Sequence, residues 1–243
     1  MLKTVLNPLR ENKGELRVVL KIGHALFKED SIDLDKTRGT AEAILQLHNK
    51  GHKIMVVAGG GALSRSYIEA ARRLGADLAT CDEIGIWVTQ LNALLLSIAL
   101  GDASNRDIIG CFEDLEKQLG VSEGRILVAG GFTPAQSTDA VAALIAERTR
   151  ADLFVKTTDV DGVYDSDPEK NPNAKMLREI SIGRLKEILM AEESKPGKYK
   201  LLDMVSLSIL ERSKIPTMIV NGSNPENIVK AVSGGKVGTR ITY

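Results

Sequence analysis

The chain has 243 residues, with 32 lysines and arginines against 32 aspartates and glutamates, so no net charge favours binding to nucleic acid or to an anionic membrane surface. Aromatic residues make up only 4%, so the core must be aliphatic, and no apolar run approaches the roughly 20 residues that cross a membrane. Cys81 and Cys111 lack the spacing of a metal or redox motif, and the N-terminus lacks the apolar stretch of a signal peptide, so we expect a cytoplasmic globular protein.

Apolar patterning predicts alternating strands and helices after a polar N-terminal extension at residues 1–15. We expect the rest of the chain, 16–243, to form one domain. In chain order, the predicted elements of its first half are a strand at 16–22, a helix at 33–50, a strand at 53–58, helices at 63–74 and 83–100, and strands at 107–110 and 125–129.

The second half opens with a helix of small residues from Ala140 to Ala146 and a short buried strand from Leu153 to Val155. The segment 192–200, which contains proline, glycine and several lysines, is predicted to be a mobile, lid-like loop. The remaining predictions are a loop at 169–175, helices at 182–190, 203–214 and 225–232, and strands at 217–222 and 237–242.

The alternation of nearly continuous apolar strands with helices is typical of an α/β protein. We predict a three-layer αβα architecture with a mainly parallel central sheet covered by helices on both faces. Ligands of such sheets bind beyond the carboxyl ends of the strands. Four polar or glycine-rich segments each follow a predicted strand and should converge on one edge of the sheet: 23–25, 59–65, 130–139 and 156–167.

The segment 130–168 carries the densest set of chemical groups. Two glycines are followed by a polar run, and any of the residues 137–139 could cap the next helix, whose N-terminal N–H groups attract anions. The following strand ends in Lys156 and two threonines, beside an acidic loop that contains Tyr164. This order predicts a phosphate site next to a base or ribose site. The alternative is an ordinary βα unit with a turn-rich loop.

A second phosphate-binding signal is the triple glycine at 59–61. Its N–H groups can face an anion, and Arg65 in the next helix supplies a guanidinium fork. The sequence is not a Walker A loop, since no Gly-Lys-Ser/Thr follows. The alternative is a tight strand–helix turn. Lys21, at the end of the first strand, could neutralise phosphate as a point charge or could be an exposed lysine.

Two aspartates have both a structural and a functional interpretation. Asp82 lies just before the predicted helix at 83–100, where it could cap the helix or accept hydrogen bonds from ribose hydroxyls. Asp139 lies at a helix start, where it could be a cap, could orient Lys21 and Lys156, or could hold magnesium. His24 is distinguished only by its place in the first turn.

Eight segments, in order along the chain, resemble those of the amino-acid-kinase superfamily and, within it, of the archaeal-type uridylate (UMP) kinases. The resemblance covers nearly the whole chain from about Arg17. The matching segments are LKIGHALF, VVAGGGALSRSYIEAARRLGA, CDEIGIWVTQLNALLL, GGFTPAQSTDAVAALIAE, KTTDVDGVYDSDP, PGKYKLLD, LERSKIPTMIVNG and VGTRIT.

This resemblance implies direct in-line transfer of a phosphoryl group from ATP to UMP, with Mg²⁺ on the ATP phosphates and no general base. It also implies nucleotides as the small-molecule partners, an acceptor-binding part at about 16–150, an ATP-binding part at about 151–243, and a homo-oligomer, a hexamer built as a trimer of dimers. It assigns no metal ligand.

Carried over by motif, the catalytic residues would be Lys21, Arg65, Asp139 and Lys156, with the two lysines neutralising the transferred group and Asp139 organising them. UMP would be held by Gly60, Asp82, Gly131, Phe132, Thr133, Pro134, Ala135, Gln136, Ser137 and Thr138. ATP would be held by Gly23, His24, Gly61, Arg65, Thr158, Tyr164 and Asp167.

Three places depart from the family pattern, and one of them is Lys156, which resembles the bacterial pattern more than that of many archaeal relatives. His24-Ala25 stands where many relatives have Gly-Ser or Ser-Gly, and Gln90 stands where many archaeal relatives have arginine. These departures leave open a nucleotide-binding regulatory or storage protein with little kinase activity. Another alternative is a kinase of a different small phosphate, carboxylate or carbamate. Asp82 and the run 131–138 argue against that alternative, as does the absence from GGGALSR of the histidine that marks isopentenyl phosphate kinases.

Overall fold

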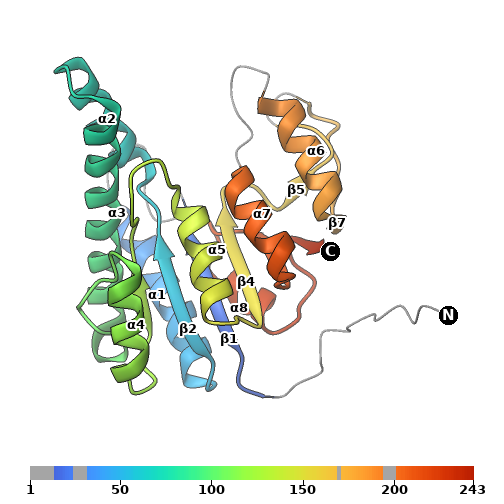
Figure 1. Ribbon diagram of the computed structural model, residues 1–243. Coiled ribbons are helices and arrows are strands. Elements are labelled where there is room, and N and C mark those ends of the chain that lie inside the picture. The colour runs from blue at the N-terminus through green and yellow to red at the C-terminus, as the bar shows by residue number, and fades with distance from the viewer. Residues whose placement is uncertain (1–13, 24–31, 169–170, 194–200) are drawn as a thin grey trace.

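The computed structural model of the chain describes residues 14–23, 32–168, 171–193 and 201–243 (Figure 1). Within these residues a seven-stranded sheet has the order β3-β2-β1-β4-β8-β9-β7. Five neighbouring strands are parallel: β3 (Leu127–Ala129), β2 (Lys53–Ala58), β1 (Arg17–Ile22), β4 (Leu153–Thr158) and β8 (Thr217–Asn221). The strand β9 (Thr239–Thr242) runs antiparallel to β8, and β7 (Glu179–Ser181) runs parallel to β9.

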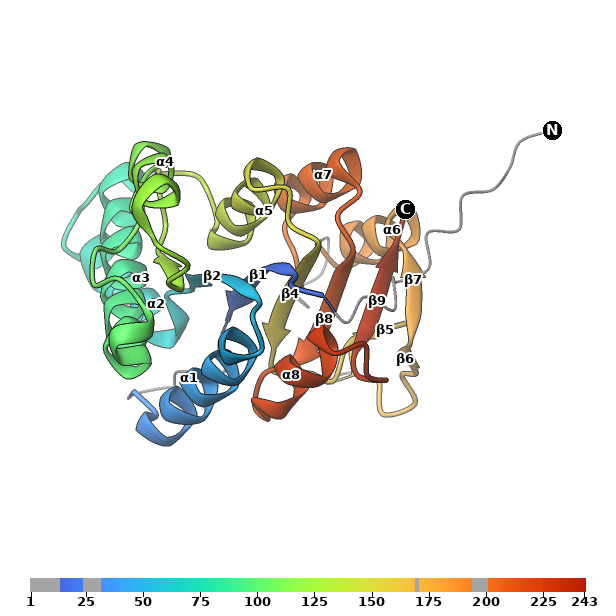
Figure 2. The ribbon, with the colours of Figure 1, turned by 90° about the horizontal axis from the view of Figure 1, so that it is seen from below.

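Helices cover both faces of this sheet, as the view from below shows (Figure 2). On one face lie α5 (Thr138–Arg148) and α7 (Met204–Ser213), and on the other lie α1 (Leu34–Asn49) and α8 (Glu226–Val232). The predicted three-layer αβα fold with a mainly parallel sheet is therefore confirmed. The remaining elements are α2 (Gly61–Arg73), α3 (Leu78–Leu100), a 3₁₀ turn (Gly101–Ala103), α4 (Phe112–Val121), α6 (Ile182–Glu193) and the hairpin of β5 (Val163–Tyr164) with β6 (Met176–Leu177).

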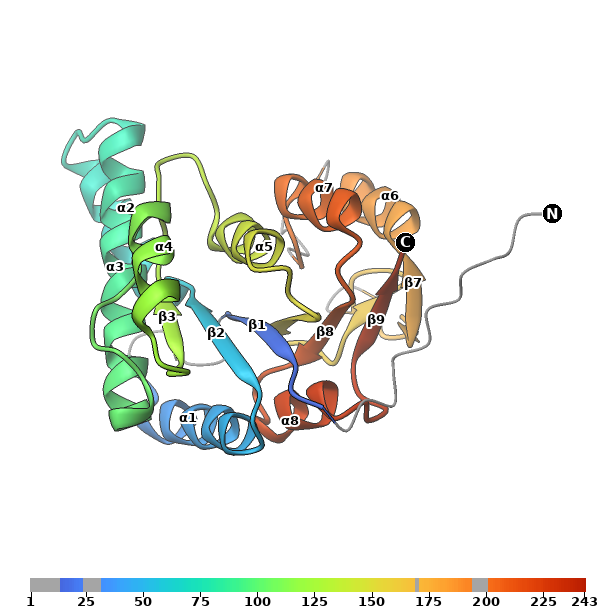
Figure 3. The ribbon, with the colours of Figure 1, turned by 60° about the horizontal axis from the view of Figure 1, so that its bottom comes forward.

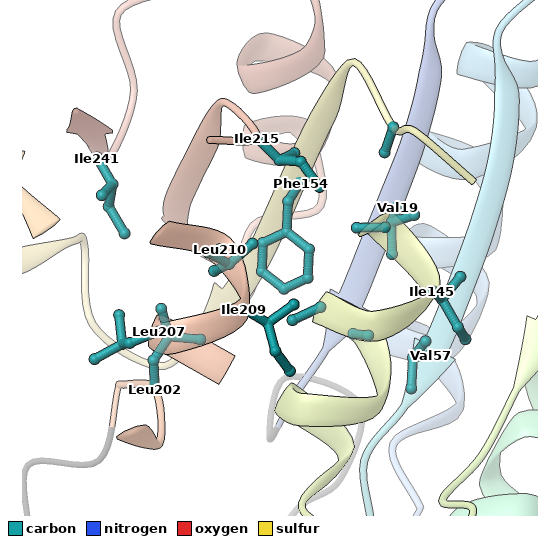
Figure 4. Close-up of a cluster of buried hydrophobic side chains, with 14 of the residues drawn as sticks. Val19, Val57, Ile145, Phe154, Leu202, Leu207, Ile209, Leu210, Ile215 and Ile241 are labelled. Carbon is teal, nitrogen blue, oxygen red and sulfur yellow. The ribbon is translucent and has the colours of Figure 1, made fainter. Parts of the chain in front are cut away.

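The alternation of side chains along the strands creates two aliphatic cores. Val19 of β1 and Phe154 of β4 belong to the core under α5 and α7, where Phe154 lies among Val19, Ile209 and Leu210 (Figure 4). Leu20 and its alternating neighbours belong to the core on the α1 and α8 side. Because strand side chains alternate with a period of two, Lys21 and Lys156 share the α5 face with Val19 and Phe154.

One predicted strand is wrong. Residues 107–110 form no strand; Ile109 makes a single bridge with Ala129, and the chain then enters α4, which was not predicted. The signal for α4 was present, because Phe112, Leu115 and Leu119 are spaced as on one helix face and two acidic residues lie in the first turn. The two-residue strands β5 and β6, and the short strand β7, were also missed.

The long helix α3 begins five residues before the predicted start. Asp77 caps it by accepting a hydrogen bond from the backbone N–H of Thr80 at 2.9 Å, so Asp82 lies inside the helix rather than before it. The helix α6 continues to Glu193, so the first two residues of the predicted lid are helical. The rest of that prediction, residues 194–200, lies outside the described residues.

By length and composition alone, the segment Leu78–Ala103 could cross a membrane. In the fold, however, α3 packs against α1, α2 and β3, and Val88, Ala93 and Leu96 on it are buried in the protein interior. A core helix satisfies the same criteria as a membrane span, and this packing identifies α3 as a helix of the folded domain.

Candidate functional site

The strands β3, β2 and β1 lie side by side (Figure 3), and β4 pairs with β1 in the same parallel sense. The site lies at the edge of the sheet where these four strands end and their following loops begin. The glycine loop 59–61 follows β2, and the loop 130–137 follows β3 and leads into α5. The predicted convergence is therefore confirmed for these two loops and for the described part of the others. His24 and Ala25 lie outside the described residues.

Three charged side chains meet at this edge. Lys21 of β1 and Lys156 of β4 are paired in register on adjacent strands, and each is only 6% exposed. The Nζ of Lys156 lies 2.5 Å from Oδ2 of Asp139 on α5, and the Nζ of Lys21 lies 3.6 Å from Oδ1 of the same carboxylate. That Oδ1 is buried and accepts no hydrogen bond from a described residue. The cluster thus has two cations for one anion.

Burial lowers the pKa of Lys21 to about 8, since the charged form loses its hydration, and the nearby Lys156 acts in the same direction while Asp139 opposes it. Burial also opposes ionisation of Asp139, but the two lysines outweigh that effect and hold the pKa of this carboxyl group below its usual value. The site therefore holds an ionised carboxylate between two ammonium groups, one of which readily loses its proton. Such a cluster attracts an additional anion.

The glycine loop lies directly beside this cluster. A Cβ atom at Gly59 would lie 2.9 Å from Nζ of Lys21, and one at Gly60 would lie 2.4 Å from Cβ of Ser64. Gly61 has a φ of +64°, in the left-handed region that favours glycine. The N–H groups of Gly60 and Gly61 donate no hydrogen bond to a described residue. Close packing and a positive φ together explain the three glycines.

The helix α2 starts at Gly61, two residues before the predicted start. Arg65 is the fifth residue of this helix, rather than part of its first turn, and it is exposed. Arg65 therefore lies one helical turn beyond the glycine loop.

The loop 130–137 is fixed to α3 and α5 by hydrogen bonds. Ser137, rather than Thr138 or Asp139, is the N-cap of α5 and accepts a hydrogen bond from the backbone N–H of Ala140 at 3.0 Å. The backbone N–H of Ala135, whose φ is +59°, donates to Oδ2 of Asp82 at 2.8 Å. Asp82 therefore supports this loop and caps no helix.

Other predicted residues of this loop are arranged in different ways. The N–H of Gly131 donates to Oγ1 of Thr89 at 2.7 Å. The ring of Phe132 packs edge-on against Phe112 with centroids 5.2 Å apart. Apart from Gly131, which is buried, the predicted residues of this loop reach the surface fully or in part, Thr133, Pro134 and Gln136 among them.

Of the predicted ATP residues, Gly61 and Arg65 belong to α2, and the other described ones follow β1, end β4 or lie on and after β5. The N–H of Gly23 donates to Oγ1 of Thr157 at 3.1 Å, and Thr158 ends β4 as a buried residue. Tyr164 lies on β5, which is joined to β9 by a 2.8 Å hydrogen bond from the N–H of Val163 to Oγ1 of Thr239. Asp167 follows β5 and is 5% exposed. The hairpin strand that carries Tyr164 thus lies on the β9 side of Lys156, whereas Gly23 follows β1 on the opposite side of β4.

Sequence reasoning missed several residues of the site. The hydroxyl of Ser137 donates to the carboxylate of Asp203, which caps α7. The negative charge of Asp203 opposes the lowering of the pKa of Lys21 by burial. On α3, the buried side chains of Thr89 and Asn92 contact the two loops. Polar side chains within the apolar run of α3, at positions 89 to 92, were the available signal. Within the described residues, no three acidic, histidine or cysteine side chains are grouped so as to hold a metal ion.

Comparison with known proteins agrees with this geometry. The profile of the amino acid kinase family matches residues 16–221. The uridylate kinase of Hyperthermus butylicus is 44% identical over 226 residues, which cover 93% of this chain and 97% of that protein, and the uridylate kinase of Methanobrevibacter smithii is 39% identical over 93% and 99%.

Similarity extends to a solved structure. The crystal structure of uridylate kinase from Archaeoglobus fulgidus has a TM-score of 0.82 and 38% identity, with coverage of 93% of this chain and 100% of that one. The motif resemblance to archaeal-type uridylate kinases is thus confirmed. Since the family profile spans most of the chain and these relatives align over nearly their full lengths, the chain belongs to the amino acid kinase family.

Proposed function

We propose that this chain transfers the γ-phosphoryl group of ATP to UMP, giving UDP and ADP. The observation that carries the proposal is the buried cluster of Lys21, Asp139 and Lys156, placed where the loops 59–61 and 130–137 meet in a chain similar to uridylate kinases along its length. In this reaction a phosphate oxygen of UMP forms a bond to Pγ. The bond from Pγ to the β–γ bridging oxygen breaks, and ADP leaves with that electron pair.

The cluster suits this chemistry because phosphoryl transfer depends mainly on alignment and on neutralisation of charge. Lys21 and Lys156 would contact the transferring group, and Asp139 would keep both ammonium groups at the same point. A nearby phosphoryl group also favours the protonated form of Lys21. The phosphate of UMP is already ionised, so the reaction requires no general base.

We assign the acceptor to the side of the cluster bounded by α3. Gly60, Asp82 and the residues 131–138 would surround UMP. Since Asp82 accepts a hydrogen bond from Ala135 through one oxygen, its other oxygen would serve the ribose. The Phe132 ring packs on Phe112, so its contribution to UMP recognition would come from backbone atoms.

We assign ATP to the β4 side. Gly23, His24 and Gly61 would lie near its phosphates, Arg65 between the donor and acceptor phosphates, and Thr158, Tyr164 and Asp167 near its adenosine. The donor would be the Mg²⁺ complex of ATP, in which phosphate oxygens and water hold the ion, as this cation prefers. The acceptor part would then comprise about 16–150 and the ATP part about 151–243.

We also propose that the chain forms a homo-oligomer, a hexamer arranged as a trimer of dimers. A stripe of large apolar side chains on the outer face of α3 supports self-association, since Trp87, Leu91 and Ile98 are each more than half exposed. A cytoplasmic location fits the proposed substrates, ATP and UMP.

A coupled assay of ADP release tests this function. Purified protein is given ATP and Mg²⁺ together with UMP, CMP, AMP, GMP or no acceptor, and turnover confined to UMP is expected. Turnover with a different nucleotide would show that this nucleotide, rather than UMP, is the acceptor. Protein that binds ATP but turns over no nucleotide would favour the regulatory or storage interpretation.

A further inference from the structure

Asn92 is a buried amide in the middle of the apolar helix α3, and it contacts the glycine loop. Its Nδ2 donates hydrogen bonds to the carbonyl oxygens of Gly59 at 2.8 Å and Gly60 at 3.3 Å, and the residue is only 3% exposed. A buried polar side chain lowers stability unless its hydrogen bonds are satisfied, so a leucine would be the simpler choice for a helix core. The contact therefore points to a role beyond packing.

The geometry of the peptide bond gives this contact a consequence for the opposite side of the loop. In a trans peptide, the carbonyl of one residue and the N–H of the next point in opposite directions, and no described peptide bond is cis. When Asn92 holds the carbonyls of Gly59 and Gly60, the N–H groups of Gly60 and Gly61 face away from α3. These two N–H groups have no hydrogen-bond partner among the described residues.

Glycine makes such a constraint necessary. Without a Cβ atom, the peptides of the loop can rotate into several conformations, including ones that turn carbonyl oxygens toward the cluster. A carbonyl oxygen carries partial negative charge and would repel a phosphate, whereas an N–H group attracts one. The loop lies close enough for this to matter, since a Cβ atom at Gly59 would be 2.9 Å from Nζ of Lys21.

We propose that Asn92 is a positioning residue for phosphate binding, which fixes the glycine loop with its N–H groups directed at the anion. The inference rests on the proposed function, because that function supplies the nucleotide phosphates. The same helix fixes the second loop: Oγ1 of Thr89, one turn earlier, accepts the N–H of Gly131, and Nε2 of Gln90 donates to the Gly131 carbonyl at 3.2 Å. One rigid helix thus sets the spacing of both loops.

Substitution of Asn92 tests the inference, with Ser97 as the matched control. Asn92→Leu keeps the branched shape and the number of heavy atoms of the side chain and removes the donor. Ser97 is a fully buried polar residue on the same helix, but its hydroxyl bonds to Ser104 and to the carbonyl of Asn105, both at 2.8 Å, and to neither loop. Ser97→Ala therefore measures the loss of a buried hydrogen bond alone.

For Asn92→Leu we expect the KM for UMP and for MgATP, and the calorimetric Kd of each, to rise at least about ten-fold, the scale of one hydrogen bond to a charged group. Ser97→Ala should lower Tm and leave these constants unchanged. If Asn92→Leu lowers Tm as Ser97→Ala does but leaves KM and Kd at wild-type values, Asn92 is merely structural and the inference is wrong. Wild-type protein that fails to phosphorylate UMP would instead contradict the proposed function, and Kd for MgATP would still test Asn92.

A second variant keeps the test decisive if Asn92→Leu does not fold. Asn92→Asp has the same shape, but its ionised form would face two carbonyl oxygens and repel them. Burial and the neighbouring carbonyl oxygens would raise the pKa of this carboxyl group, and its protonation restores one donor. The kcat/KM of this variant relative to wild type should therefore increase as the pH is lowered from 8 to about 6. A ratio that stays constant with pH would contradict the proposed contact.

Discussion

Lys21 and Lys156 occupy directly paired positions on the neighbouring strands β1 and β4, and both face the carboxylate of Asp139. Two buried ammonium groups side by side repel each other, and one carboxylate leaves the cluster with one positive charge in excess. An incoming phosphoryl group would supply the missing negative charge. Asp139 therefore offsets only part of the free-energy cost of burying two charged lysines. A bound phosphoryl group would offset the rest.

Asp139→Asn should destabilise the protein. The substitution leaves the buried Lys21 and Lys156 without their carboxylate, and loss of one partner from a buried ion pair costs about 3 kcal/mol or more. Urea unfolding monitored by circular dichroism would measure this loss, which should appear as a lower midpoint without a change in slope.

Glu147→Gln is the control for that experiment. Glu147 pairs with Arg212 at 2.5 Å between α5 and α7, but the Arg212 side chain is 61% exposed. Pairs of this kind contribute only about 0–1 kcal/mol. Equal destabilisation by both substitutions would show that Asp139 is no more important to the fold than a surface carboxylate.

The pH dependence of activity should report the charge of Lys21. Since its pKa in the free protein is lowered to about 8, the side chain loses its positive charge as the pH rises through that value, and kcat/KM, which reports the free enzyme, should fall above pH 8. Lys21→Arg keeps the charge, so any activity that this variant retains should lack the decline. A decline that is identical in both proteins would assign it to another group.

The same shift has an opposite effect on stability. The folded pKa of Lys21 lies below its unfolded value of 10.5, so the unfolded chain holds more protons between pH 8 and 10.5. Across that window the contribution of Lys21 to the free energy of unfolding should increase with pH. Wild type should therefore lose less stability than Lys21→Met between pH 8 and 10, as measured by urea unfolding at each pH.

Gly61→Ala should impair both stability and nucleotide binding. Its φ of +64° costs a residue with a side chain about 1–2 kcal/mol, and relaxation of the backbone would turn the N–H groups of the glycine loop. Gly183→Ala is the matched control, since Gly183 lies in α6 and a Cβ atom added there would have no neighbour within 4 Å. This variant should be slightly more stable than wild type. Thermal unfolding and the KM for MgATP distinguish the two variants. Wild-type values for Gly61→Ala would remove this glycine from the site.

Arg65→Ala should reduce kcat/KM for UMP by a factor that corresponds to a loss of about 2 kcal/mol or more of transition-state stabilisation, the scale of a charge-assisted hydrogen bond to phosphate. Arg72→Ala, on an exposed turn of the same helix α2, should have little effect because Arg72 lies only 3.8 Å from Glu69 in a surface ion pair. Steady-state kinetics with UMP as the varied substrate would measure both. Equal kinetics in the two variants would place Arg65 outside the reaction.

Much of this fold could be predicted because its strongest elements carry local signals. The strands β1 and β2 are mainly apolar runs followed by a glycine, β4 begins with three apolar residues, and α5 follows a capping serine. The two-residue strands β5 and β6 carry too few residues for a periodic pattern. The start of α3 was missed because the cap is Asp77 rather than Asp82, and an aspartate at either position could cap a helix.

The site was predictable to the extent that its residues follow strands. Lys21, Lys156 and Asp139 were expected to meet because they end strands or begin a helix at one sheet edge. The contact of Ser137 with Asp203 was not, since these residues are 66 positions apart and meet only through the packing of α5 on α7. Asn92 was missed for a related reason, because its partners lie 33 and 32 positions away and are backbone atoms.

The central claim, direct transfer of phosphate to UMP by the lysine cluster, is tested most directly with ATP labelled in its γ-phosphoryl group. Wild-type protein incubated with this ATP, Mg²⁺ and UMP should give labelled UDP, and Lys156→Met, once shown to bind UMP, should give at least about 100-fold less, as expected for loss of a group that stabilises transition-state charge. Label that appears as inorganic phosphate or on another acceptor, or labelled UDP formed equally well by Lys156→Met, would contradict the account.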